Sequence, residues 1–209
     1  MIQTSALRFQ YADAQEIFEF PDLHLKHEEQ LLILGKSGVG KTTLLHLLAG
    51  LLRPLSGSIN LVSQDLDSLT AAQLDTFRGK HIGLVFQNNH AIQSLTVQEN
   101  VEARLFFSRK PRDSEQISEL LTELGLFDVK DRKVRRLSVG QLQRLAIALA
   151  VVHEPSLILA DEPTSSLDDI NCKLVIELLL AQAEKTKANL IIITHDDRVK
   201  RYFKNSLNL

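Results

Sequence analysis

GKSGVGKT, at residues 35–42, is the stretch that decides the fold of this chain. It has the spacing G-x-x-x-x-G-K-[ST], whose glycines let the backbone turn tightly and aim its N–H groups at an anion. The apolar run LLIL at 31–34 predicts a buried strand before it, and TLLHLLA at 43–49 predicts a helix after it. A strand, a glycine-rich loop and a helix N-terminus in this order indicate a site for a nucleoside triphosphate.

The side chains at the end of this loop have distinct expected roles. Lys41 can reach the β- and γ-phosphates as a point charge, and the Thr42 hydroxyl can take one position around Mg²⁺. The backbone of the loop and of the helix start is expected to bind the phosphates themselves. The candidate ligands are Gly35, Lys36, Ser37, Gly38, Val39, Gly40, Lys41, Thr42 and Thr43.

Composition narrows the class of protein. The chain has 209 residues, 44% hydrophobic and 24% charged, which fits one globular domain with its own core. A net charge of −2 provides no basic field, so we expect no nucleic-acid partner. Cys172 is the only cysteine, which excludes an internal disulfide and favours a reducing compartment. No signal peptide and no apolar stretch near the ~18 residues of a membrane span are present, so we expect a cytoplasmic chain.

Four apolar runs of the chain each lead into a glycine or a polar residue. Runs without alternation indicate strands buried on both faces, as in a parallel sheet covered by helices. Ligands bind beyond the carboxyl ends of such strands, so the residues at these ends are expected to form one site. The runs and the residues after them are 31–34 with Gly35, 82–86 with Gln87, 157–160 with Asp161 and 190–194 with His195.

Two adjacent carboxylates follow the third of these runs. Asp161 is expected to hold Mg²⁺, which leaves Glu162 to orient and polarise an attacking water as a general base. An acidic pair at a strand end is, taken alone, more often a solvated surface feature. Gln87 and His195 are also weak candidates when taken alone, and they are supported only by the other residues expected at the same strand ends. There Gln87 would contact Mg²⁺ or its water, and His195 would donate to the γ-phosphate.

A second helix start carries the pattern S-V-G-Q. Ser138 is the predicted N-cap of a helix over 138–152, with Gly140 and Gln141 in its first turn. Helix N-termini bind anions, but a glycine near a helix start is common, so the pattern alone is a weak signal.

Together these motifs resemble those of the nucleotide-binding subunits of ATP-binding cassette (ABC) transporters. Their order and spacing agree with the family along essentially the whole chain. The segments that carry the resemblance are Walker A at 35–43, the Q-loop at Gln87, the signature at 137–141 (LSVGQ against L-S-G-G-Q), Walker B at 157–164, the D-loop at 165–168 and the switch histidine at His195.

The resemblance implies a two-lobed α/β fold of the P-loop NTPase type within a single domain, 1–209. A RecA-like core with a mostly parallel sheet would carry Walker A, Walker B and His195, beside an N-terminal antiparallel β subdomain. An inserted helical subdomain, at approximately 88–152, would carry the signature.

The resemblance also implies an ATPase that works as a homodimer. Each ATP would lie between the phosphate loop of one copy and Ser138, Gly140 and Gln141 of the other, and Asp168 would help to join the halves. ATP binding would close the dimer, and hydrolysis through Glu162 would open it. A separate integral membrane permease would convert this motion into transport and hold the chain at the cytoplasmic face of the inner or plasma membrane.

One further position, Tyr11, agrees with the family pattern, and another, Val139, departs from it. Tyr11 lies where the family places the aromatic residue that stacks on adenine, although alternation also puts it on the strand face of Leu7 and Phe9. Val139 replaces the first glycine of the signature pair, and its branched side chain crowds a backbone meant to approach phosphate. We expect nucleotide binding to survive this departure, with slower closure.

Further segments narrow the family. Residues 69–78, 81–87 and 94–101 resemble the group of lipoprotein-release ATPases, antimicrobial or macrolide exporters and their cell-division relative. Lipoproteins, peptides or lipophilic compounds are therefore the expected cargo. The alternative is an ATPase of the same family that serves soluble partners, as in iron–sulfur assembly or cell division. The basic cluster, which is either a solvated surface or a docking surface for the permease, consists of Lys130, Arg132, Lys133, Arg135 and Arg136.

Overall fold

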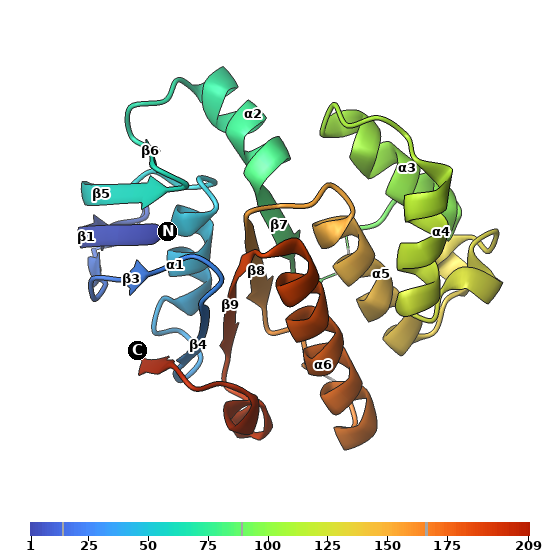
Figure 1. Cartoon of the computed structure of the whole chain (residues 1–209). Helices are drawn as coiled ribbons and strands as arrows, with labels where there is room; N and C mark the ends of the chain where they lie inside the picture. The colour runs from blue at the N-terminus through green and yellow to red at the C-terminus, as the bar shows by residue number, and fades with distance from the viewer. Residues whose placement is uncertain (14, 89, 166) are drawn as a thin grey trace.

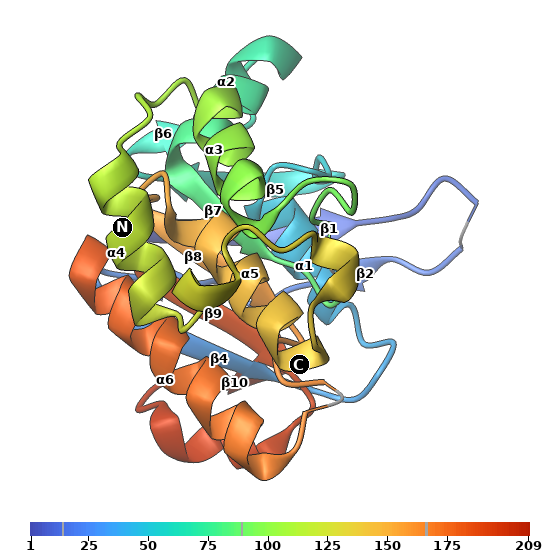
Figure 2. The same ribbon diagram turned by 90° about the vertical axis from the view of Figure 1, so that its right-hand side faces the viewer.

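The computed structural model describes the whole chain except residues 14, 89 and 166. Figures 1 and 2 show two β-sheets with helix α1 (Lys41–Leu48) between them, and the long helices α5 and α6 on the far side of the sheet that contains β4, β8 and β9. This layered arrangement buries both faces of that sheet, which is what its non-alternating apolar strands require.

A five-stranded parallel sheet forms the centre of the fold, in the strand order β10-β4-β9-β8-β7. Every neighbouring pair in this sheet is parallel, so the predicted parallel sheet is confirmed. Its strands are β4 (Gln30–Leu34), β7 (Ile82–Val85), β8 (Leu157–Asp161), β9 (Asn189–Thr194) and β10 (Ser206–Asn208).

The N-terminal antiparallel sheet is also confirmed. β1 pairs antiparallel with β2, β3 and β5, and β5 pairs with β6. α1 packs between this sheet and the parallel one, and its leucines are fully buried because apolar residues surround the helix. The strands are β1 (Ile2–Phe9), β2 (Phe18–Glu19), β3 (His24–Leu25), β5 (Ser56–Leu61) and β6 (Gln64–Asp65).

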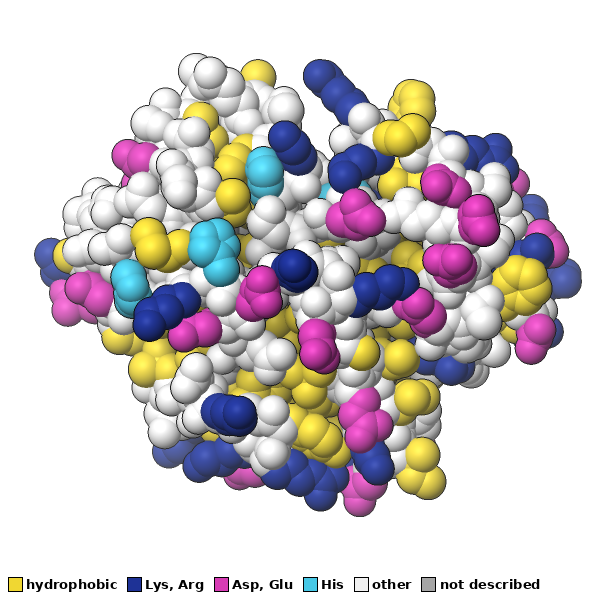
Figure 3. All heavy atoms as spheres, viewed as in Figure 1, with side chains coloured by type: hydrophobic (Ala, Val, Ile, Leu, Met, Phe, Trp, Pro, Cys, Tyr) yellow, Lys and Arg dark blue, Asp and Glu magenta, His cyan; other side chains and the backbone are white. Residues whose placement is uncertain are grey.

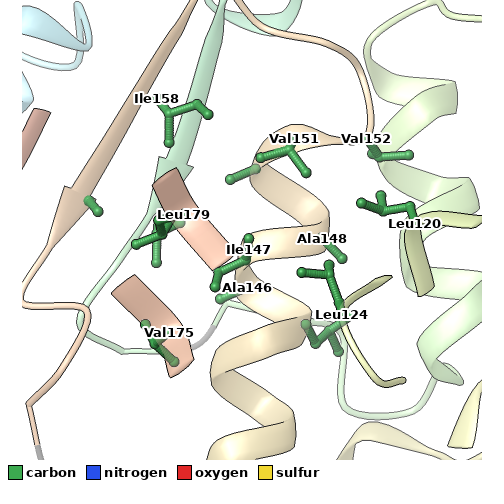
Figure 4. Packing of buried hydrophobic residues seen from close by; sticks show 14 of the residues in the cluster. Leu120, Leu124, Ala146, Ile147, Ala148, Val151, Val152, Ile158, Val175 and Leu179 are labelled. Carbon is green, nitrogen blue, oxygen red and sulfur yellow. The ribbon is translucent and has the colours of Figure 1, made fainter. Parts of the chain in front are cut away.

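Helices α5 (Val139–Val151) and α6 (Asp169–Thr186) cover the opposite face of the parallel sheet. Figure 4 shows Ile147 of α5 close to Leu179 of α6, within one buried cluster that extends from β8 to α4. The remaining helices are α2 (Ala71–His81), α3 (Val97–Phe107), α4 (Ser114–Glu123) and the 3₁₀ turns η1 (Phe127–Val129), η2 (Val134–Arg136) and η3 (Asp197–Tyr202).

The region 88–152 contains α3, α4, η1, η2 and α5. Ser138 caps α5 as predicted: its hydroxyl accepts from the Gln141 N–H, and the Gln141 side chain accepts from the Ser138 N–H. α5 packs against β7 as well as against α3, so the limits of a separate helical subdomain stay a prediction. No helix in the described part of the chain is both long and apolar enough to cross a membrane.

Gly83 lets α5 approach the parallel sheet closely. A Cβ added to Gly83 in β7 would lie 2.1 Å from the carbonyl oxygen of Ala150 and 3.1 Å from Pro155 Cγ. Because both neighbours are fixed, Gly83→Ala must push α5 away from β7. We expect it to lower the free energy of unfolding by about 1–3 kcal/mol, measured by urea denaturation.

Gly79→Ala is the matched control for this substitution. The nearest atom to a Cβ at Gly79 is 3.9 Å away, and the residue lies in α2, where alanine is the better helix former. Gly79→Ala should therefore leave the unfolding midpoint unchanged or raise it slightly. Equal midpoints for Gly83→Ala and the unsubstituted protein would contradict the close approach of α5.

Candidate functional site

The predicted strand ends meet at one pocket. β4, β9, β8 and β7 are consecutive neighbours in the parallel sheet, so their carboxyl ends share one edge. The pocket at this edge has a volume of about 520 Å³. It is lined by Phe18, Lys36, Ser37, Gly38, Gly40, Lys41, Thr42, Thr43, Gln87, Glu162 and His195.

The phosphate loop depends on two glycines with left-handed backbone. Gly38 has φ 87° and Gly40 has φ 97°, a region that side-chain-bearing residues rarely adopt. Gly40 is also the N-cap of α1, so the turn of the loop leads directly into the helix. The loop thereby presents backbone N–H groups and the positive end of the α1 dipole to the pocket.

Lys41 is the cation at the base of the pocket. Its side chain is 7% exposed, and its Nζ donates to the carbonyl oxygens of Gly35 at 2.8 Å and Lys36 at 3.0 Å. The same Nζ lies 3.9 Å from Glu162 Oε1. The loop therefore holds a partly desolvated positive charge beside a carboxylate, at the place where a polyphosphate would enter.

Glu162 is oriented by several donors from the end of β9. Its Oε1 accepts from His195 Nδ1 at 2.8 Å and from the His195 N–H at 3.1 Å, and its Oε2 accepts from Thr194 Oγ1 at 2.7 Å. Its backbone has φ 48°, in the left-handed region that is costly for a glutamate. The surrounding structure thus fixes both the backbone and the carboxylate of this residue, as a general base requires.

Asp161 lies behind Glu162 at the carboxyl end of β8 and is 5% exposed. Burial raises the pKa of its carboxyl group, and a hydrogen bond from the Thr42 side chain partly offsets this rise. Asp161 Oδ1 is buried and has no hydrogen-bond partner in the described part of the chain.

These oxygen atoms fit a Mg²⁺ ion. Mg²⁺ prefers carboxylate and hydroxyl oxygens and is usually held by one or two carboxylates together with substrate phosphates. The unpartnered Asp161 Oδ1 beside the Thr42 hydroxyl provides such a donor set, and Gln87 lines the same pocket. Among the described residues there is no group of three or more His, Cys, Asp or Glu side chains that would bind a metal without a substrate.

Hydrogen bonds and ion pairs join the segment that follows Glu162 to the loop that follows His195. Asp168 caps α6 by accepting from the Asn171 N–H at 2.7 Å and from its side chain, and these bonds lower the pKa of Asp168. Arg198 donates to Asp196 and to Asp169, and the paired Asp196 has its pKa lowered to about 2. Ser166 of the expected D-loop lies outside the described residues.

The signature residues Ser138, Gly140 and Gln141 are not part of this pocket. Ser138 and Gln141 cap α5 as described, and the neighbouring Val139 is 62% exposed. Within one chain, the helix start and the phosphate loop therefore form separate surfaces. This separation is what a site completed by a second copy would require.

Sequence reasoning missed residues that shape the site through long-range contacts. Phe18 lines the pocket from β2, and Thr194 holds Glu162, although neither belongs to a motif. Thr164 was part of the segment 157–164, but its hydrogen bond to Asp196, at 2.9 Å, was not predicted. The sequence marked only the strand ends as polar. It could not show these contacts, because the residues that form them lie far apart in the sequence.

Tyr11 lies just outside the pocket. It is 42% exposed, as expected for an aromatic residue beyond a strand end, because β1 ends at Phe9. Its hydroxyl shares a hydrogen bond of 2.9 Å with Thr43 Oγ1. Tyr11 is thus next to the phosphate loop, and its proposed role in base stacking stays a prediction.

A second pocket, of about 390 Å³, lies between α2, α3 and α5, and we call it the α2–α3 groove. Phe86, Phe107 and Leu149 contribute apolar surface, and Arg104 contributes positive charge. Arg78 also lines the groove, where it is paired with Asp75. Figure 3 shows Lys and Arg side chains bordering the hollow between α2 and α3. The groove starts where the segment after Gln87 leaves the nucleotide pocket, since Asn88 and His90 line it.

The chain is similar to known proteins along most of its length. Residues 19–165 match the family model described as "ABC transporter". The chain is 36% identical to the bacitracin export ATP-binding protein BceA of Halalkalibacterium halodurans, over 90% of this chain and 75% of that protein. It is 37% identical to the lipoprotein-releasing system ATP-binding protein LolD of Hydrogenovibrio crunogenus, over 94% of this chain and 87% of that protein.

Solved structures agree with these sequence matches. The dimeric, post-hydrolysis structure of the ATP-binding cassette MJ0796 bound to ADP and Pi superposes with a TM-score of 0.89 and 32% identity. That match covers 100% of this chain and 94% of the other. A second dimeric structure of the same cassette gives the same TM-score of 0.89.

Proposed function

Because this chain belongs to the ABC transporter family and is one of its ATP-hydrolysing subunits, we propose that it powers export through a separate integral membrane permease. The cargo we propose is a lipoprotein, a peptide or another lipophilic compound. Relatives named for bacitracin export and for lipoprotein release support this choice. The observation that carries the ATPase chemistry is the convergence of Lys41, Glu162 and His195 on one pocket.

The proposed binding mode places the polyphosphate of ATP in the phosphate loop. The N–H groups of residues 36–43 would bind the phosphate oxygens, and Lys41 would exchange its carbonyl partners for the β- and γ-phosphates. Asp161, Thr42 and Gln87 would hold Mg²⁺, which neutralises charge on the phosphates when it is bound.

The proposed hydrolysis step uses Glu162 and His195. Glu162 would accept a proton from the attacking water, since its carboxylate is held at the pocket wall by Thr194 and by the His195 N–H. His195 Nδ1 lies 2.8 Å from Glu162 Oε1, and a doubly protonated imidazole would donate from Nδ1 to Glu162 and from Nε2 to an oxygen of the γ-phosphate. The attacking water and the γ-phosphate would then lie between Glu162, at the end of β8, and His195, at the end of the neighbouring strand β9.

A second copy of the chain would complete the site. Dimeric structures of a similar cassette support a homodimer in which Ser138, Gly140 and Gln141 of one copy face the phosphate loop of the other. The exposed Val139 would lie at that contact, and we expect it to slow closure without preventing binding. Asp168, at the exposed start of α6, would help to join the halves.

The permease would dock at the α2–α3 groove. The groove combines aromatic and aliphatic walls with Arg104, which suits a short amphipathic helix that carries an acidic residue. Arg104 forms no ion pair with a carboxylate in the described part of the chain. The basic cluster lies at the other end of α3, where the Lys133 segment bridges to Thr96, and would extend this docking surface.

Phe107→Asp should therefore release the chain from its membrane partner. Phe107 is 71% exposed and lines the groove, so a carboxylate there removes apolar contact area and alters the charge facing the partner. After affinity purification from detergent-solubilised membranes, we expect at least about a tenfold loss of the co-purified integral membrane protein.

Phe106→Asp is the matched control for the docking experiment. Phe106 is 76% exposed and contacts Phe107 at 5.6 Å between ring centroids, but it does not line the groove. The control should retain the membrane partner. Recovery of the unsubstituted chain with soluble partners alone would favour the alternative, an ATPase of iron–sulfur assembly or cell division.

A further inference from the structure

Two phenylalanines at the C-terminal end of α3 are exposed side by side. Phe106 is 76% exposed and Phe107 is 71% exposed, with 5.6 Å between their ring centroids. Phe107 borders the α2–α3 groove, whereas Phe106 does not line it, so a permease helix in the groove would leave the Phe106 ring uncovered. Adjacent exposed rings are typical of a surface that contacts a partner or a membrane.

A basic hollow of about 420 Å³ adjoins these rings. Lys80, from the last turn of α2, lines it. Arg109 and Lys110, which follow α3, line it together with Phe107. Figure 3 shows hydrophobic side chains next to Lys and Arg side chains around the hollow between α2 and α3. We call this surface the α3-end patch, and it consists of Lys80, Phe106, Phe107, Arg109 and Lys110.

Positive charge exceeds negative charge on the α3-end patch. Acidic side chains around it are paired with cations of their own. The pairs are Asp75 with Arg78, Glu102 with Arg112 and Glu154 with Lys110. Lys80 and Arg109 form no ion pair in the part of the chain that the structure describes. The pKa of the neighbouring His81 is lowered by burial and then by the charges of Lys80 and Lys110, which agrees with a positive local field.

Arg109 occupies a backbone position that favours glycine. Its φ is 54°, and it follows Ser108, the C-cap of α3. The Arg109 N–H donates to the carbonyl of Phe106 at 3.1 Å, and the Lys110 N–H donates to the carbonyl of Leu105 at 3.0 Å. This is the Schellman pattern, in which glycine is the usual residue at the left-handed position. The turn therefore does not require an arginine, and the exposed guanidinium is available to an anion outside the chain.

We propose that the α3-end patch contacts an anionic phospholipid surface, with Phe106 at the level of the headgroups and with Lys80 and Arg109 facing lipid phosphates. Exposed aromatic rings suit the membrane–water interface, and each Lys or Arg near an anionic surface adds attraction. Gly79 and Phe107 line both the hollow and the α2–α3 groove, so the patch adjoins the surface proposed for the permease. Its nearness to a membrane rests on that proposed function, whereas the lipid contact itself needs no permease.

Flotation of the full chain with lipid vesicles tests the contact in the absence of a permease. The unsubstituted chain should float at low salt with vesicles of phosphatidylglycerol and phosphatidylcholine in equal amounts, and less at high salt, because salt screens the attraction. It should bind vesicles of phosphatidylcholine alone at least about tenfold more weakly. Phe106→Asp should weaken binding to the anionic vesicles about tenfold or more, because it replaces the apolar ring by a carboxylate.

Arg109→Gly separates a lipid contact from a structural role. Glycine relieves the left-handed backbone, so the urea unfolding midpoint should stay the same or rise, while binding to the anionic vesicles falls about fivefold. Arg109→Lys keeps the charge and should bind like the unsubstituted chain. Lys187→Gly is the matched control, because Lys187 is an exposed cation with the same φ of 54° at the end of α6. It should leave vesicle binding unchanged.

A fluorescent probe locates the contact, since the chain contains no tryptophan of its own. In Phe106→Trp, the emission of the introduced indole should shift to shorter wavelength on the anionic vesicles as the ring enters the interface. Phe127→Trp is the control. Phe127 is 39% exposed with Lys130 Nζ 4.3 Å from its ring centroid, and the Lys130 segment is hydrogen-bonded to the opposite end of α3. Its emission should not change.

Several outcomes would overturn the lipid assignment. One is failure of the unsubstituted chain to float with anionic vesicles, and another is equal flotation of Arg109→Gly and the unsubstituted chain. Loss of the co-purified membrane protein from Phe106→Asp in detergent would mean that the ring contacts a protein and not lipid. A shift in Phe127→Trp but not in Phe106→Trp would place the lipid contact at the basic cluster. Failure of the lipid contact is distinguishable from failure of the proposed function, because ATP hydrolysis and recovery of the permease are measured without vesicles.

Discussion

Glu162→Gln abolishes multiple-turnover ATP hydrolysis in our account, while ATP binding and ATP-dependent dimerisation persist. The amide cannot accept a proton from the attacking water, and the loss of a positioned general base costs about 10²–10⁴-fold in rate. The substitution fits the structure because the amide oxygen can accept from His195 and the amide nitrogen can donate to Thr194 Oγ1. Steady-state phosphate release measures the rate, and size-exclusion chromatography with ATP measures dimerisation.

Glu184→Gln makes the same chemical change at an exposed position on α6 and is the control. It should hydrolyse ATP at the rate of the unsubstituted chain. Turnover by Glu162→Gln at that same rate would remove Glu162 from its assigned role as general base. A variant that neither turns over nor dimerises with ATP would contradict the separation of binding from chemistry.

Lys41→Ala has the second large expected effect, on ATP affinity. The substitution removes the buried ammonium that lies within 3.9 Å of Glu162 and hydrogen-bonds the carbonyls of Gly35 and Lys36. Charge-assisted hydrogen bonds to phosphate are among the stronger single contacts, so we expect the dissociation constant for Mg-ATP to rise about tenfold or more. Alanine is the best helix former, so α1 should remain intact.

Lys204→Ala removes an exposed lysine remote from the motifs and is the control for charge alone. Its affinity for Mg-ATP should equal that of the unsubstituted chain. If Lys41→Ala also binds Mg-ATP with unchanged affinity and keeps its melting temperature, the loop does not bind phosphate in the way proposed here.

Sequence alone predicted the parts of this fold that depend on local pattern. The non-alternating apolar runs before Gly35 and Asp161 became inner strands of a parallel sheet, one on each side of β9, because a strand buried on both faces needs helices on both sides of its sheet. The predicted N-cap Ser138 became the start of α5, because its hydroxyl accepts a backbone N–H that has no partner within the helix.

Other parts of the site could not be predicted, because they depend on contacts between distant segments. The carboxylate of Glu162 is held by Thr194 and His195, which are more than 30 residues away in the sequence, and no local pattern predicts its left-handed backbone. The link from Thr164 through Asp196 to Arg198 joins two loops that carry no common pattern. Phe18 reaches the pocket only through the pairing of β2 with β1.

The roles of the signature residues require a second copy of the chain. Ser138 and Gln141 satisfy each other within α5, so nothing in a single chain displays their proposed contact with ATP. Their exposure at a helix N-terminus is compatible with that contact, and dimeric structures of a similar cassette support it. The dimerisation assay with Glu162→Gln addresses this step, since that variant should hold ATP without consuming it.

The central claim is that the loop 35–42 and Lys41 bind the polyphosphate of ATP. Titration calorimetry of the unsubstituted chain with Mg-ATP, combined with thermal denaturation, tests it most directly. We predict a saturable heat of binding and a rise in melting temperature, since ligand at 100 times its dissociation constant stabilises the folded state by about 2.7 kcal/mol. No heat and no change in melting temperature at saturating Mg-ATP would contradict the account.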